Sequence, residues 1–226
     1  MKNVFFVFLC FINILTNAQQ HIFIEELDKN PTCPYDLNKT LLENINSSWN
    51  QFDIQGDLIL YLKIDTNGNI NNVNIIKGLQ ESFDRNIRHI FYRLPMWNAA
   101  EFKGKKVESI VFIFIQFQSD SNDLKCNVKI ENIGEKATYN YNLEEVFINN
   151  LNPNIFKVGF EGTFQFYFSI DTLGRICNVN ILKGFTEGLN DIILKAVNEL
   201  PNWESAKLNE KKVESIIYIT YKHFLE

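Results

Sequence analysis

The stretch GDLILYLKIDTNGNINNVNIIKG at Gly56–Gly78 recurs in this chain as GTFQFYFSIDTLGRICNVNILKG at Gly162–Gly184. Farther on, LPMWNAAEFKGKKVESIVF at 94–112 recurs as LPNWESAKLNEKKVESIIY at 200–218. The two copies are separated by the same 106 residues throughout, so the repeat needs no gap. Solenoid repeats are about 20–50 residues long, and a longer period is typical of a duplicated domain. The function is therefore one that a small module performs twice or that two copies divide.

A β-hairpin is predicted in each copy, because every second residue of its first strand is apolar. The strand, turn and strand are Leu58–Ile64, Asp65–Gly68 and Ile70–Lys77 in the first copy, and Phe164–Ile170, Asp171–Gly174 and Ile176–Lys183 in the second. Asp65 and Asp171 are interpreted as turn formers, since Asp binds its own backbone and Gly accepts a positive φ. A calcium loop is disfavoured, because Leu173 occupies a ligand position and no glutamate follows at the EF-hand spacing.

An amphipathic helix is predicted after each hairpin. Its apolar residues are Phe83, Ile87, Ile90, Phe91 and Leu94 in one copy, and Leu189, Ile193, Ala196, Val197 and Leu200 in the other. This spacing places one apolar stripe on a sheet. Pro95 and Pro201 end the helices. Trp97 and Trp203 follow, and we interpret both as structural lids on the core.

A shorter helix precedes each hairpin, and a third strand closes each unit. Asp36 and Asn142 are the expected N-caps of the short helices. The closing strands begin at Val107 and Val213, with alternate residues facing the core. We therefore expect an α+β fold of two tandem units. Each unit is a three-stranded antiparallel sheet in the order 2-1-3, with two helices on one face.

The expected segments are a signal peptide (1–18), an N-terminal segment (19–35), a first unit (36–118), a linker (119–140) and a second unit (141–226). Asn127–Ile130 is a candidate extra strand in the linker. Lys2, the apolar run Val4–Leu15 and the small-residue exit at Ala18 are typical of a cleaved secretory signal. The run is shorter than the roughly 20 residues of a membrane span. We expect a periplasmic or secreted protein, with an inner-membrane anchor as the alternative.

Composition and residue pattern argue against several function classes. The formal net charge is −5, and no basic run interleaved with aromatics occurs, which disfavours nucleic-acid binding. His21, His89 and His223 are scattered and do not match between the copies. No nucleophile elbow, phosphate loop or metal-binding spacing occurs in the sequence. We predict a protein that is not an enzyme, with no catalytic residue, metal or small-molecule cofactor.

Three cysteines follow the expected signal peptide. Export permits a disulfide, and an odd count leaves one thiol free. Cys33 and Cys126 each lie shortly before the folded part of a unit, so they are the favoured pair. Cys177 is expected to be a partly buried free thiol on a strand.

Each unit resembles the TonB C-terminal domain, in a form similar to that of Bacteroidetes-type energy transducers. The features that carry the resemblance are Gly56, Ile64-Asp65 with Gly68, Val73, Lys77-Gly78, Leu94-Pro95-x-Trp97, Gly104-Lys105 and Val107, and their counterparts Gly162, Ile170-Asp171 with Gly174, Val179, Lys183-Gly184, Leu200-Pro201-x-Trp203, Lys211 and Val213. Together they cover most of the expected mature chain.

The resemblance implies a protein or peptide partner, for example a TonB-dependent outer-membrane receptor. Such a module accepts an extended peptide along an edge strand. This chain departs from a force-transmitting TonB, because its leader has no histidine and no long Pro-rich spacer follows. We expect an exported binding module that has lost energy transduction. The alternative is a membrane-anchored transducer subunit with an uncleaved leader.

The binding edge is expected on the third strand of the second unit. In the first unit this strand is apolar on both faces, so we expect the linker or the second unit to cover it. The third strand of the second unit is more polar, so we expect its edge to remain free. The predicted binding residues are Lys212, Val213, Glu214, Ile216, Tyr218, Thr220 and Tyr221.

Overall fold

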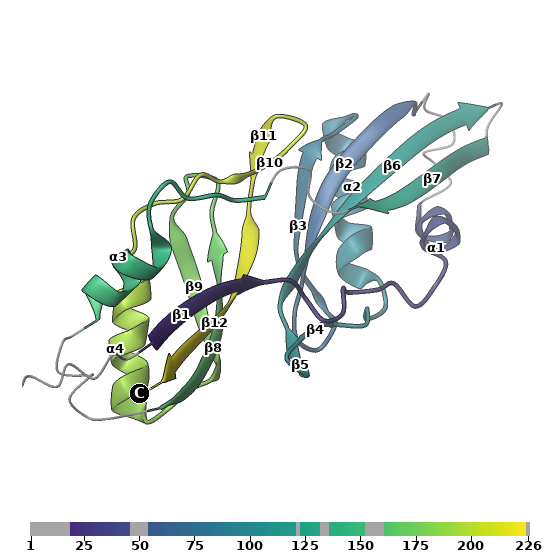
Figure 1. The fold of residues 1–226 in the computed structure, drawn as a ribbon. Helices are drawn as coiled ribbons and strands as arrows, with labels where there is room; N and C mark the ends of the chain where they lie inside the picture. Colours follow the sequence, from purple (N-terminus) through teal and green to yellow (C-terminus); the bar gives the residue numbers. More distant parts are fainter. Residues whose placement is uncertain (1–18, 46–53, 121–122, 132–135, 152–160, 225–226) are drawn as a thin grey trace, which may run out of the picture.

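The structure, a computed structural model, describes residues 19–45, 54–120, 123–131, 136–151 and 161–224 and has the expected α+β fold (Figure 1). The strands are β1 (Gln19–Glu25), β2 (Gly56–Ile64), β3 (Ile70–Lys77), β4 (Ala100–Phe102), β5 (Lys105–Val107), β6 (Ser109–Asp120), β7 (Asp123–Glu131), β8 (Gly162–Ile170), β9 (Ile176–Lys183), β10 (Ala206–Leu208), β11 (Lys211–Val213) and β12 (Ser215–Phe224). The helices are α1 (Leu37–Asn44), α2 (Glu81–Arg93), α3 (Leu143–Asn150) and α4 (Glu187–Asn198).

Two four-stranded antiparallel sheets form the two units, in the orders β3-β2-β6-β7 and β9-β8-β12-β1. The predicted 2-1-3 order is present as β3-β2-β6 and β9-β8-β12. The prediction of three-stranded units is wrong, because a fourth strand pairs with each third strand. Two short ribbons, β4–β5 and β10–β11, accompany the sheets.

The helices cover one face of each sheet, as the apolar stripes predicted. In the first unit Leu41 of α1 and Phe83 and Ile87 of α2 share a core with Leu60 and Leu62 of β2. Asp36 and Asn142 cap α1 and α3 by accepting from the amides of Lys39 and Glu145. Burial of these apolar faces supplies the main stabilising term of each unit.

The spacing between hairpin and Trp, which the two copies share, has a direct structural cause. The Trp97 amide donates to the Gly68 carbonyl at 2.8 Å, and the Trp203 amide donates to the Gly174 carbonyl at the same distance. A Cβ on either glycine would lie 1.9 Å from the Trp carbonyl oxygen, and both glycines have positive φ. Both indoles are buried, which agrees with their interpretation as core lids.

The two turn aspartates form turns, as predicted. The Asp65 carboxylate accepts from the amides of Asn67 and Asn69, and Asp171 does the same with Leu173 and Arg175. Burial alone would raise the pKa of Asp65, but the hydrogen bonds from Asn69 and its neighbours lower it overall.

The fourth strands are exchanged between the two repeats. β1 begins the first repeat but pairs with β12 of the second, whereas β7 begins the second repeat but pairs with β6 of the first (Figure 1). The registers are equivalent: Glu25 lies opposite Tyr218, and Glu131 lies opposite Phe112, with each residue 106 positions from its counterpart. The chain after each exchanged strand returns to its own repeat, where Thr32 pairs with Asn98 and Thr138 with Glu204.

The second face of each sheet packs against the other unit, and the contacts are related by the repeat. The Lys105 ammonium donates to the Leu182 carbonyl, and its counterpart Lys211 donates at 2.7 Å to the Ile76 carbonyl, the counterpart of Leu182. On the first sheet, the outward residues Ile59, Tyr61 and Phe112 join the hydrophobic core of the second unit. The expectation that the second unit covers the apolar face of β6 is therefore confirmed.

The three described cysteines are free thiols. Cys33 donates to the Tyr35 carbonyl and Cys126 to the Asn38 carbonyl, so the favoured Cys33–Cys126 disulfide is not formed in this structure. Both pack at the margin of the first core, and burial raises the pKa of each thiol. Cys177 is partly buried on β9, as expected.

Candidate functional site

The predicted binding edge is already paired with a strand of the same chain. Of the predicted residues, Tyr218, Thr220 and Tyr221 lie where β12 pairs with β1. Lys212 and Val213 belong to β11, Glu214 joins β11 to β12, and Ile216 lies in the part of β12 that β1 does not reach. The reasoning that the third strand must be an edge was wrong, because an exchanged strand protects it.

Alternate residues of an exchanged strand point their backbone groups toward its partner. The Val128 amide of β7 donates outward to Asn38 Oδ1 at 2.7 Å, so Val128 does not face β6. The neighbouring position, Lys129, therefore faces β6. By the equivalent register, Phe23 of β1 faces β12, opposite Thr220.

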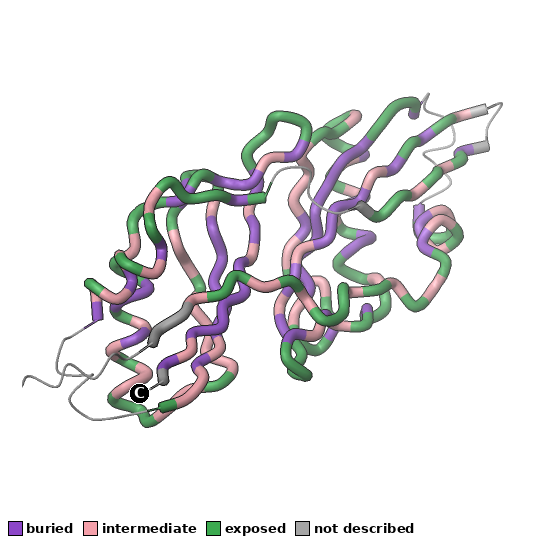
Figure 2. Tube along the Cα trace, viewed as in Figure 1, coloured by how far each residue is buried: buried purple, intermediate pink, exposed green. Residues whose placement is uncertain are grey.

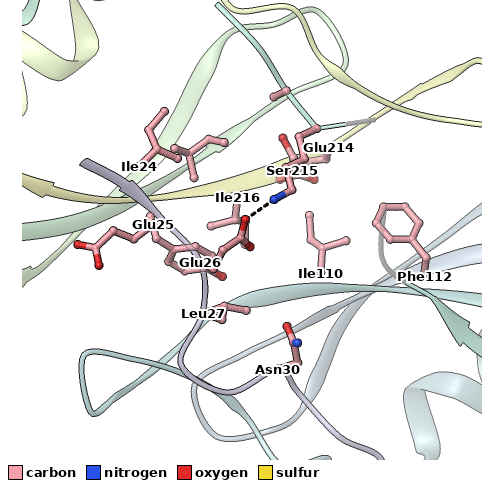
Figure 3. Close-up of a pocket in the computed structure, with 14 residues that line it drawn as sticks. Ile24, Glu25, Glu26, Leu27, Asn30, Ile110, Phe112, Glu214, Ser215 and Ile216 are labelled. Atoms are coloured by element: carbon pink, nitrogen blue, oxygen red, sulfur yellow. Dashed lines mark hydrogen bonds and ion pairs between the residues drawn. The ribbon is translucent and has the colours of Figure 1, made fainter. Parts of the chain in front are cut away.

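A cavity of about 270 Å³ begins where the β1–β12 ladder ends (Figure 3). We call it the central cavity. Its walls come from the end of β1 and the residues after it, from β6 and from β12; they are Ile24, Glu25, Glu26, Leu27, Asn30, Ile110, Phe112, Lys136, Ala137, Glu214, Ser215, Ile216, Ile217 and Tyr218. Several of these are counterparts in the repeat, such as Ile110 with Ile216 and Phe112 with Tyr218. The cavity therefore lies where the equivalent strands β6 and β12 meet.

The charged side chains around the central cavity are paired. Figure 3 shows the ion pair of Glu26, whose partner is Lys136; Glu25 pairs with Lys103. Glu214 accepts from Lys63 at 2.5 Å. The remaining surface is mainly aliphatic and aromatic.

Lys63 joins the two units beside this cavity. Its ammonium lies 2.5 Å from Glu214 and 3.3 Å from Glu108, and these glutamates are counterparts in the repeat. Burial alone would lower the pKa of Lys63, but the two carboxylates raise it overall. The counterpart of Lys63 is Ser169, so among the described residues the two carboxylates share the one ammonium of Lys63. The alternation of β2 indicates only that Lys63 lies on the face turned away from the first core, so sequence reasoning missed this role.

The two exchanged strands differ in how they are held. β7 places Leu124 in the first core with 5% of its surface exposed, and its Val128 amide is bound by α1. Among the described side chains of β1, which are those of residues 22–25, Ile22 packs against the second core. Phe23 and Ile24 remain 43% and 44% exposed. Figure 2 colours part of β1 as exposed. β1 therefore contributes less apolar burial than a fourth strand can provide.

The other polar residues gather into no comparable site. His89 is exposed on α2, whereas His223 is buried on β12. Within the described ranges no group of three His, Cys, Asp or Glu side chains could hold a metal ion. No helix among the residues that the structure describes is long and apolar enough to cross a membrane, and the expected signal peptide lies outside them.

Comparisons of this chain with protein-family models, with curated proteins and with solved structures found no match.

Proposed function

We propose that this protein is an exported, non-catalytic binding module that accepts an extended peptide of a partner protein by strand addition to β12. β1 occupies this edge in the free protein, and the partner strand takes its place. The partner is a protein of the cell envelope, for example an outer-membrane receptor, as the TonB-like sequence pattern suggests.

The observation that carries this proposal is the β1–β12 ladder itself. Seven residue pairs, from Gln19↔Phe224 to Glu25↔Tyr218, align an extended antiparallel strand on β12. Strand addition takes its affinity from such backbone hydrogen bonds, which any sequence of sufficient β propensity can make. The edge is thus built to receive an antiparallel strand, and the chain supplies one from its own N-terminal part.

β12 is favoured over β6 because β1 is the more weakly held exchanged strand. Displacing β7 would expose the buried Leu124 side chain. It would also leave Asn38 Oδ1 without the hydrogen bond that the Val128 amide donates. Displacing β1 removes two side chains that are already more than 40% exposed. Lys125 and Lys129 also protect β7 against edge pairing, since charged edge residues oppose it.

The test uses a fluorescent peptide with the sequence of β1, QQHIFIE, and the chain from Gln19 onward. Phe23→Pro removes an amide that faces β12, so β1 should detach and the peptide should bind. The unchanged chain should bind the peptide at least tenfold more weakly, because its own β1 competes at a high effective concentration. Fluorescence anisotropy measures both affinities.

Lys129→Pro is the matched control, since it alters the equivalent position of β7. It should destabilise the first unit without creating a site for the β1 peptide. If Phe23→Pro leaves the chain folded by circular dichroism but does not bind the peptide, the proposal is wrong. Equal binding to the unchanged and Phe23→Pro chains would instead show that the peptide binds away from the β1 position and would overturn replacement.

A further inference from the structure

We infer that the central cavity is a side-chain pocket of the peptide site, and that it selects an aliphatic or aromatic residue just beyond the segment that replaces β1. This inference rests on the proposed strand addition and adds to it the class of peptide that binds. Backbone pairing with β12 supplies affinity that does not depend on the peptide sequence, and the cavity selects the side chain that follows.

The first step concerns the unused backbone of β12. Alternate residues face β1, so the position after Tyr218 on this side is Ile216. β1 does not reach it, and in the described part of the chain Ile216 has no hydrogen-bonding partner on that side. The Ile216 N–H and C=O are therefore available to pair with a bound strand, one hydrogen-bonded position beyond the Glu25–Tyr218 pair.

The second step explains why β1 stops there. The amides of Asp28 and Lys29 both donate to the Glu101 carbonyl, at 2.9 and 3.2 Å, and the Lys29 ammonium lies 2.7 Å from the Glu101 carboxylate. These bonds draw the backbone from Asp28 onward toward the first unit, so β1 does not continue along β12, although the Leu27 side chain still packs beside Tyr218 and Ile216. A separate peptide has no such tether, so it can continue along β12 as far as Ile216.

The third step places the side chain of the added residue. Residues directly opposite each other in an antiparallel pair share one face. A peptide residue opposite Ile216 therefore lies on the face of Ile216 and Tyr218, which is turned toward the first unit. Figure 3 shows Ile110, Phe112 and Ile216 around the space on this side.

The fourth step concerns size and charge. The cavity, at about 270 Å³, is smaller than the roughly 300–1,000 Å³ of small-molecule pockets, and suits one side chain. Glu214 of β12 already has Lys63 as its partner, and the two glutamates of a QQHIFIEEL peptide would take the places of Glu25 and Glu26 beside Lys103 and Lys136. A charged guest would lose its hydration without gaining an unpaired opposite charge. Burying an apolar side chain should instead raise affinity about tenfold to a hundredfold.

The test compares two fluorescent peptides on the Phe23→Pro chain. The short peptide, QQHIFIE, ends opposite Tyr218, and the long peptide, QQHIFIEEL, places its leucine opposite Ile216. We expect the long peptide to bind at least tenfold more tightly. A long peptide carrying Leu27→Asp should lose that gain. Amide exchange at Ile216 should slow with the leucine peptide only.

Ile110→Glu on β6 lines the cavity and lies outside the β12 ladder, so it should abolish the gain and leave the short peptide's affinity unchanged. Ile130→Glu changes an exposed residue of β7 away from the cavity and should alter neither affinity. Equal affinities of the short and leucine-bearing peptides would overturn the pocket while leaving strand addition intact. Failure of both peptides to bind would overturn the proposed function itself. If the Phe23→Pro chain does not fold, Phe23→Asp weakens the same strand and permits the same comparison.

Discussion

Replacing Lys63 by methionine should destabilise the protein and weaken the junction of its two units. Methionine keeps most of the aliphatic stem but removes the cation between Glu108 and Glu214. Lys63 is 10% exposed at its side chain, and the two glutamates are 22% and 16% exposed. Breaking a fully buried ion pair costs about 3–5 kcal/mol, whereas surface pairs contribute about 0–1 kcal/mol. The partial exposure here places the expected loss at about 2–3 kcal/mol.

The assay is urea and thermal unfolding followed by circular dichroism. For a chain of this length, the expected loss lowers Tm by roughly 5–10 °C. Ser169→Ala, at the equivalent position of the second unit, is the matched control and should change Tm little. Replacing all three charged side chains, as Lys63→Met with Glu108→Leu and Glu214→Leu, should restore most of the stability, because no unpaired charge is then buried.

The pH dependence gives a second check. The pKa of Lys63 is raised in the folded protein above its ordinary value of 10.5. Its contribution is therefore complete below pH 10.5 and is lost as the pH rises through the folded pKa. The stability difference between the unchanged chain and Lys63→Met should be constant near neutral pH and shrink in strong alkali. Equal stability of the two chains at pH 7 would refute the role assigned to Lys63.

Three further changes test the packing of the units. Trp203→Ala should cost about 3–5 kcal/mol in chemical unfolding, because it empties a buried aromatic site; unchanged stability would contradict its structural role. Gly174→Ala should cost at least about 3 kcal/mol, because the positive φ and the Trp203 carbonyl both exclude a Cβ. Gly104→Ala has open space around it and should cost about 1 kcal/mol in the same measurement. Asn38→Ala should leave the Val128 amide without its acceptor, cost about 1–2 kcal/mol, and speed hydrogen exchange along β7; exchange that is unchanged there would show that α1 does not hold this strand.

The parts of the fold that the sequence predicted are those with local, periodic signals. Strand alternation identified β2 and β8, and helical stripes identified the buried faces of α2 and α4. The turn glycines and the Pro-x-Trp motif were predicted separately. Their contact through the Gly68 and Trp97 backbones was not predictable, because it joins residues on different elements.

β1 was missed because it is short, lies at the expected N-terminus and pairs with residues about 200 positions away. The signal that could have found it is the repeat itself. Extending the 106-residue spacing upstream aligns QQHIFIE at 19–25 with KCNVKIE at 125–131, which contains the candidate strand Asn127–Ile130. Both end in Ile-Glu and have an aliphatic residue two positions before the isoleucine. The exchange between units still needed the structure, since either partner would satisfy the same pattern.

The two repeats share an apolar core pattern and differ at positions where they meet. Two pairs of counterparts that differ in chemistry beside the junction or the exchanged strands are Lys63 with Ser169 and Lys129 with Phe23. Lys63 supplies one cation to two equivalent glutamates, which a second lysine at Ser169 would disturb by like-charge repulsion in the same interior. Lys129 keeps β7 soluble at its edge, whereas Phe23 leaves β1 with apolar surface on its exposed side. Under the proposed strand addition, duplication would have allowed one sheet to retain its exchanged strand firmly while the other exchanges its strand for a partner's.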